Sequence, residues 1–121
     1  MLNEKRNKIL ELSFDFASEI IELTRYLKLN KEFVISNQLL KSGTSIGANV
    51  SEAQAAQSTK DFIAKMSIAS KEARETEYWI RLLEKSNTIN AYKNKSVLYD
   101  QIHSIVKLLT SIIKTTQEKN I

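Results

Sequence analysis

The stretch that decides the fold runs from Lys41 to Leu83, and its most informative part is Ser42-Gly-Thr-Ser-Ile-Gly-Ala-Asn-Val-Ser-Glu-Ala53. This run has the apolar spacing of a helix and holds both glycines of the chain. Because glycine inside a helix costs about 1 kcal/mol relative to alanine, two glycines need a reason. Gly43 and Gly47 are four residues apart and share a face, so we predict close packing against a neighbouring helix there. A phosphate-binding loop is disfavoured, because its glycines lie at a strand-to-helix turn.

Residues 59–86 are predicted to form the next helix, because Ser58 and Asp61 have the spacing of a capping box ahead of an apolar residue. The apolar seam of this helix steps strictly by four and three residues, which is a heptad pattern. The seam consists of Phe62, Met66, Ala69, Ala73, Thr76, Ile80 and Leu83.

A second apolar stripe lies off this seam and carries the single tryptophan of the chain. Such a stripe is costly to leave in water, so we predict that another copy of the protein covers it. Coverage by the first or last helix of the same chain is the alternative. The predicted oligomer interface comprises Ile68, Glu75, Tyr78, Trp79 and Leu82.

Helical spacing also predicts helices over residues 3–28, 32–56 and 94–118. The composition agrees, because the 121-residue chain has no proline, two glycines and 42% hydrophobic residues. Sheets need turn residues every few positions, and the chain lacks them. We therefore predict a single all-α domain over residues 1–121, built as an antiparallel up-down-up-down four-helix bundle.

Catalytic and metal-binding constellations are not evident in the sequence. The chain has no cysteine, which excludes disulfides and thiolate zinc sites. A di-iron bundle would need two Glu-x-x-His pairs, whereas the one histidine, His103, is predicted to face solvent without an orienting carboxylate beside it. We expect no enzymatic activity, no cofactor and no metal. No stretch approaches the roughly 20 apolar residues of a membrane span, and we expect a cytoplasmic protein.

The charge balance admits two interpretations. Eighteen lysines and arginines against fourteen acidic residues give a net charge of +4, which fits an ordinary mixed-charge surface or a nucleic-acid-binding protein. Five copies in one assembly would carry +20, because 5 × 4 = 20. Tyr78 is placed either to stack on a base or to pack against a neighbouring subunit. The main nucleic-acid-binding candidates are Lys41, Lys71, Arg74, Arg81 and Lys85, and the N-terminal candidates are Lys5, Arg6 and Lys8.

The central part of the chain resembles a known family. The similarity rests on Ser45-Ile-Gly-Ala-Asn-Val-Ser-Glu-Ala53, Asp61-Phe-Ile, Ile68-Ala and Lys71-Glu-Ala-Arg-Glu-Thr-Glu-Tyr-Trp-Ile-Arg-Leu-Leu83. These segments resemble the bacterial four-helix-bundle proteins encoded by intervening sequences within 23S ribosomal RNA genes. Many relatives carry proline where this chain has Gly47 and glycine where it has Ala53, which indicates a subgroup.

The resemblance implies a ring-like homo-oligomer, with a pentamer as our expectation, and no enzymatic activity. Related bundles are accessory proteins of diversity-generating retroelements, where their expected role is to bind nucleic acid and a reverse transcriptase. We therefore predict a non-enzymatic ring that binds structured RNA or DNA through its basic surface. The alternative is a protein-interaction scaffold or accessory subunit that recruits a protein, such as a reverse transcriptase, without touching nucleic acid. Asn49 and Glu52 belong to the family-like motif, and we expect them, with Glu75, to form hydrogen bonds between helices or subunits.

Overall fold

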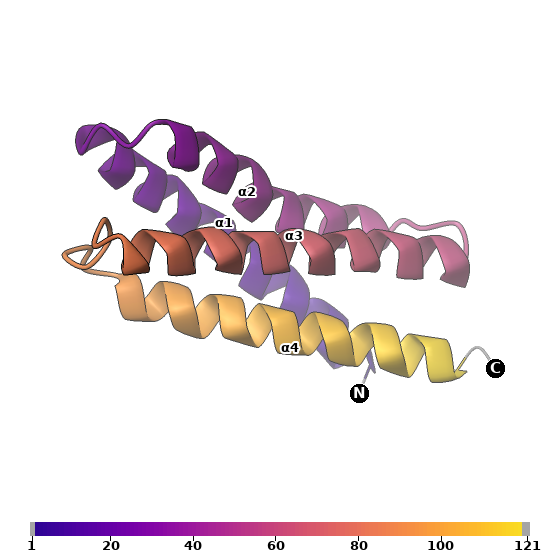
Figure 1. The fold of residues 1–121 in the computed structure, drawn as a ribbon. Coiled ribbons are helices and arrows are strands. Elements are labelled where there is room, and N and C mark those ends of the chain that lie inside the picture. Colours follow the sequence, from indigo (N-terminus) through magenta and orange to yellow (C-terminus); the bar gives the residue numbers. More distant parts are fainter. Residues whose placement is uncertain (1, 120–121) are drawn as a thin grey trace.

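The computed structural model describes residues 2–119 and contains four helices in that range: α1 (Leu2–Leu29), α2 (Val34–Ala53), α3 (Thr59–Lys85) and α4 (Lys95–Lys119). Figure 1 shows successive helices running in opposite directions, with α1 inclined behind the others. The start of α1 and the end of α4 lie at the end of the bundle that holds the α2–α3 turn. The predicted all-α antiparallel four-helix bundle is confirmed.

Each helix packs against two neighbours, because α1 contacts α2 and α4, and α3 contacts α2 and α4. The diagonal pairs α1–α3 and α2–α4 make no comparable backbone contact among the described residues. All seven residues of the predicted α3 seam are buried, so this seam prediction is confirmed. The bundle therefore has one continuous core enclosed by a closed ring of four helix pairs.

The two glycines lie where α2 meets α1. A Cβ atom added to Gly43 would lie 2.8 Å from Cγ1 and 2.9 Å from Cγ2 of Ile20, and Ile20 is fully buried. A Cβ atom added to Gly47 would lie 3.3 Å from the backbone oxygen of Ser13. Close backbone packing is confirmed as the reason for both glycines.

Small hydroxyl side chains join α2 to α3 on the adjacent face of α2. The buried Thr76 hydroxyl lies 2.9 Å from Oγ of Ser42 and 2.8 Å from the carbonyl oxygen of Glu72. Buried polar groups without partners are costly, and these two hydroxyls satisfy each other. The pair fixes the register of α3 on α2.

The α3–α4 turn is tied to α1, which sets the position of α4. Ile89 is fully buried and Tyr92 is nearly so. The Tyr92 hydroxyl donates to a carboxylate oxygen of Glu19 at 2.5 Å, and Nδ2 of Asn94 donates to the same oxygen at 3.1 Å. Burial is the main cause that raises the pKa of Tyr92, followed by its hydrogen bond to Glu19.

The predicted bounds of the second helix are wrong at both ends, since α2 covers Val34–Ala53 rather than residues 32–56. At the start, the amides of Lys31 and Glu32 close the end of α1 by binding the carbonyl oxygens of Lys28 and Leu27. Lys31 has a φ of 64°, which is the left-handed residue of a Schellman helix end. At the other end, the amides of residues 54–56 bind carbonyls three residues back, which tightens the last turn.

Replacing Gly43 by alanine should destabilise the bundle. Overpacking against Ile20 costs about 1–3 kcal/mol, and better helix propensity returns about 1 kcal/mol, so we expect a net loss of up to about 2 kcal/mol. Urea unfolding at fixed protein concentration measures it. Gly47→Ala is the matched control, because its Cβ would lie 3.3 Å from the nearest atom rather than 2.8 Å. A Gly43→Ala variant as stable as Gly47→Ala would contradict the steric argument.

Replacing Lys31 by glycine should stabilise the protein by about 0.5–1 kcal/mol, because a lysine is strained in the left-handed region and glycine is not. Thermal and urea unfolding report the gain. Asn87 has a φ of 60° at the end of α3, and asparagine tolerates this conformation better than lysine. The gain from Asn87→Gly should therefore be the smaller of the two, and the reverse order would refute the explanation.

Candidate nucleic-acid interface

One face of α3 carries four positive side chains and a tyrosine in a single row. The row steps by three, four, three and four residues, and all five side chains are exposed. At 100° per residue it lies opposite the core seam of α3, and its length is roughly 21 Å. We call it the basic row; it consists of Lys71, Arg74, Tyr78, Arg81 and Lys85.

The cations of the basic row form no ion pair with another residue of the range 2–119. The ion pairs within residues 2–119 join Arg25 to Glu22, Lys95 to Glu84 and His103 to Glu77, and none uses a cation of the row. Each of the four cations therefore lacks a direct ion-pair partner within the described part of the protomer.

The other predicted basic residues lie apart from this row. Lys41 is exposed on α2. Nζ of Lys5 donates to Oγ of Ser111 at 2.7 Å, and the guanidinium of Arg6 stacks on Phe62 with Cζ 3.9 Å from the ring centroid. Lys8 is exposed near the start of α1. The structure thus gathers four of the five main candidates and disperses the rest.

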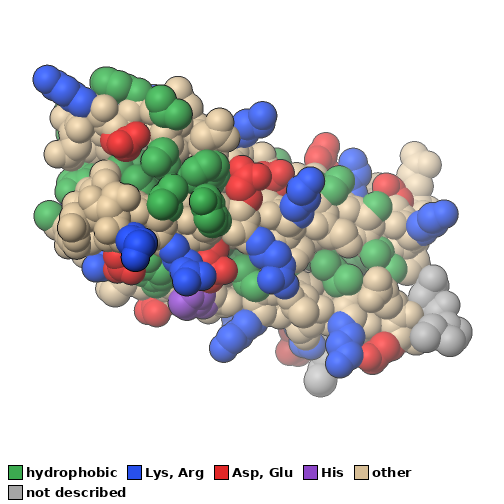
Figure 2. Space-filling model, in the orientation of Figure 1, with side chains coloured by type: hydrophobic (Ala, Val, Ile, Leu, Met, Phe, Trp, Pro, Cys, Tyr) green, Lys and Arg blue, Asp and Glu red, His purple; other side chains and the backbone are tan. Residues whose placement is uncertain are grey.

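A groove of about 690 Å³ runs beside the basic row, between the C-terminal half of α3 and the N-terminal half of α4. Tyr78, Arg81 and Lys85 of the row form one wall, and Tyr99 and His103 of α4 form the other. Figure 2 shows lysine and arginine side chains interspersed with a few acidic ones along this face of the molecule. We call this feature the α3–α4 groove.

Contacts from α4 hold both carboxylates of the groove. Glu84 accepts hydrogen bonds from Nζ of Lys95 and from the hydroxyl of Tyr99, both at 2.9 Å. These bonds, that of Lys95 first, lower the pKa of Glu84 below its ordinary value. Nε2 of His103 lies 3.1 Å from the Glu77 carboxylate. The prediction of a solvent-facing histidine is confirmed, but the expectation that no carboxylate lies beside it is wrong.

Among the groove residues, Tyr99 has a pKa well above its ordinary value. Burial is the main cause, and its hydrogen bond to Glu84 is the second, which together raise the pKa of Tyr99 to about 12. The Tyr99 hydroxyl therefore remains a proton donor to Glu84 at all moderate pH values. This bond joins α4 to α3 along the groove.

The predicted oligomer-interface residues divide between two faces of α3. Tyr78 belongs to the basic row, whereas Ile68, Glu75, Trp79 and Leu82 form a neighbouring row, which we call the apolar flank; Leu82 also lines the α3–α4 groove. Ile68 is 45% exposed, and the indole nitrogen of Trp79 donates to Glu75 at 3.3 Å. Figure 2 shows hydrophobic side chains gathered over α2 and the C-terminal half of α3. Their role as an interface remains a prediction.

The polar residues of the family-like motif make local contacts. Nδ2 of Asn49 donates to the carbonyl oxygen of Ser45 in its own helix at 2.8 Å, and Glu52 is exposed. Neither they nor Glu75 bonds to another helix among the described residues. Bonds to a second subunit remain a prediction for all three.

Sequence reasoning missed the α4 side of the groove and its two acidic partners. Glu77 and Glu84 are seven residues apart on α3, and Tyr99 and His103 are four apart on α4. These spacings place each pair on one helix face. The signal was visible, but the register between α3 and α4 was needed to bring the faces together.

The fold and surface define an antiparallel helical-bundle protein with a basic row on its third helix. Residues 5–111 match the model of the family described as 23S rRNA-intervening sequence protein, and the chain belongs to this family. It is also similar to a protein of unknown function from the S23 ribosomal protein family of Bacteroides thetaiotaomicron VPI-5482, known from a 1.70 Å crystal structure. The two are 48% identical with a TM-score of 0.85, over 91% of this chain and 98% of that one. No curated protein matches the sequence.

Two further features of residues 2–119 bear on the site. This part of the chain holds no cluster of three or more histidine, cysteine, aspartate or glutamate side chains suited to a metal ion. Within the same range, no helix is both apolar enough and long enough to span a membrane.

Replacing Tyr99 by phenylalanine should flatten the loss of stability between about pH 10 and pH 12. A tyrosine in the unfolded chain releases its proton near pH 10, whereas native Tyr99 retains it to about pH 12. Unfolding therefore becomes more favourable as pH rises through this window, and the variant lacks this contribution. Urea midpoints at pH 8, 10, 11 and 12 measure the slope. The control is Tyr78→Phe, which removes an exposed hydroxyl; identical slopes for both variants would refute the assignment.

Proposed function

We propose that this protein is a non-enzymatic, cytoplasmic homo-oligomer that binds structured RNA or DNA through the basic surface of an assembled ring. The observation that carries the proposal is the basic row, because its four cations are exposed and free of ion pairs within residues 2–119. Such cations gain most from phosphate contacts, which release counterions from the nucleic acid.

The dimensions of the row suit a phosphate backbone. One strand of duplex DNA has a phosphate about every 3.4 Å along the axis, so a row of roughly 21 Å faces about six of them. Tyr78 lies at the middle of the row and is 59% exposed. An exposed aromatic ring between cations can stack on an unpaired base, which favours structured RNA with loops or bulges.

Assembly would multiply this modest charge. The apolar flank and the basic row are neighbouring faces of α3, so a second copy covering Ile68 and Trp79 would leave Arg74 and Arg81 open to solvent. Our expected assembly is a pentameric ring, which would carry five times the net charge of +4. A strongly positive ring attracts polyanions over longer distances than one protomer does.

The alternative function is a protein-interaction scaffold or accessory subunit. Trp79 and Leu82 on the apolar flank favour it, since tryptophan is enriched at the energetic centres of protein interfaces. A reverse transcriptase is one such partner. The salt dependence of binding distinguishes the two functions, because phosphate contacts weaken steeply as salt rises and apolar contacts do not.

The double variant Arg74→Gln with Arg81→Gln should weaken binding to a structured RNA and to duplex DNA by about tenfold or more at low salt, because it removes two phosphate contacts per protomer. Fluorescence anisotropy at several salt concentrations gives the affinities, and light scattering gives the mass of the assembly. The slope of log affinity against log salt should also become shallower.

The matched control is Lys107→Gln with Lys114→Gln, which removes the same charge from exposed positions seven residues apart on α4. Its affinity should fall much less. Equal losses for both variants would show that only net charge matters. The wild-type assembly failing to bind either nucleic acid at low salt would end the proposal and favour the scaffold.

A further inference from the structure

A second concave site lies at the other end of α3. It is a pocket of about 440 Å³ between the first turns of α1, the α2–α3 turn and the last turn of α4. None of its lining residues belongs to the basic row or the α3–α4 groove. Phe62 in this pocket and Arg81 in the groove are 19 residues apart, roughly 28 Å along the axis of α3.

The charge of the pocket has one sign. Among residues 2–119, Arg6 of α1 and Lys119 of α4 line it, and no aspartate or glutamate does. The remaining polar groups are the Gln54 amide and three hydroxyls, and Phe62 with Leu2 and two alanines provides apolar walls. An anion with an apolar part matches both kinds of lining.

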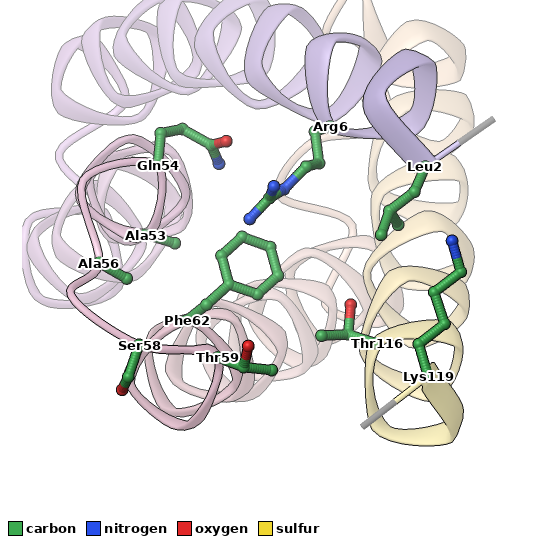
Figure 3. A pocket seen from close by; sticks show the side chains of 10 residues that line it. All are labelled: Leu2, Arg6, Ala53, Gln54, Ala56, Ser58, Thr59, Phe62, Thr116 and Lys119. Atoms are coloured by element: carbon green, nitrogen blue, oxygen red, sulfur yellow. The ribbon is translucent and has the colours of Figure 1, made fainter. Parts of the chain in front are cut away.

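Arg6 is the residue whose surroundings indicate a ligand site. Figure 3 shows its side chain reaching from α1 over Phe62 into the middle of the pocket, with the Gln54 amide directed toward the same space. Cζ of Arg6 lies 3.9 Å from the centroid of the Phe62 ring. Its Nε atom is buried and has no hydrogen-bond partner among residues 2–119. Stacking orients the planar guanidinium, whose buried Nε–H group lacks an acceptor among residues 2–119.

We propose that this pocket binds a small organic anion, namely a carboxylate or phosphate attached to an apolar group. Arg6 would hold the anionic end with paired N–H donors, as guanidinium groups do with carboxylates and phosphates. Lys119 would add a second positive charge, and Phe62 would contact the apolar part. The pocket has room for more than ten water molecules at roughly 30 Å³ each, so a bare acetate or phosphate ion fills only a fraction of it. This proposal is independent of nucleic-acid binding by the basic row.

The side-chain Nε–Hε resonance of Arg6 in ¹⁵N-correlated NMR spectra is a direct reporter. The full chain is titrated at constant ionic strength with benzoate, phenyl phosphate, acetate, inorganic phosphate and benzyl alcohol. Benzoate or phenyl phosphate should shift the Arg6 signal and bind about tenfold more tightly than the ions without a ring, because the ring adds buried apolar area. A preference between benzoate and phenyl phosphate identifies the anionic group.

Variants test the role assigned to Arg6. Arg6→Gln should weaken binding of the preferred probe by about tenfold or more, because glutamine lacks both the positive charge and the paired N–H donors of the guanidinium. Arg6→Lys keeps the charge and the stem, and it should recover only part of the affinity; it also serves if Arg6→Gln fails to fold. Arg25→Gln is the control on the same helix, because Arg25 is exposed and paired with Glu22. Backbone shifts at Phe62 and Gln54 report binding in the variants.

Three results would overturn the proposal. The first is an Arg6 signal that no probe moves. The second is benzyl alcohol binding as well as benzoate, which would make the pocket merely apolar. The third is acetate or inorganic phosphate binding as well as the ring-bearing probes, which would leave only general anion attraction.

Discussion

The close approach of α2 to α1 is the constraint on which the rest of the bundle depends. Gly43 leaves no room for even a methyl group beside the fully buried Ile20. On an adjacent face α2 presents Ser42, which meets Thr76 of α3. Small side chains on these two faces let α2 approach both of its neighbours closely, and the Ser42–Thr76 contact holds the seam face of α3 against α2. This arrangement directs the α3 seam inward and the basic row outward.

Three faces of α3 therefore have three different roles. One face fills the core, a second carries the apolar flank, and a third carries the basic row. The fourth helix supports this arrangement at the groove, where Lys95 and Tyr99 hold Glu84 and His103 holds Glu77. Acidic side chains next to the basic row are thus engaged from α4, while the cations of the row are left open to solvent.

The sequence was sufficient to predict the number of helices, the α3 seam and the packing role of both glycines, because helical period and glycine cost are local properties. The start of α2 was mispredicted because Lys31 adopts a left-handed backbone conformation. This conformation is uncommon for lysine, so the residue type does not predict it. The His103–Glu77 contact and the burial of the Arg6 Nε atom depend on segments far apart in the chain. No pattern within one helix reveals how two helices are aligned along their length.

The closed ring of helix contacts has a consequence for chain connectivity. Three of the four packed pairs, α1–α2, α2–α3 and α3–α4, are joined by a turn, and the fourth, α1–α4, packs without one. Since α1 begins and α4 ends at the same end of the bundle, the packing itself does not distinguish the open pair from the linked ones. The fold therefore depends on which helices pack together rather than on the order in which the chain connects them. This makes it a natural candidate for circular permutation at the turn between Ala53 and Thr59.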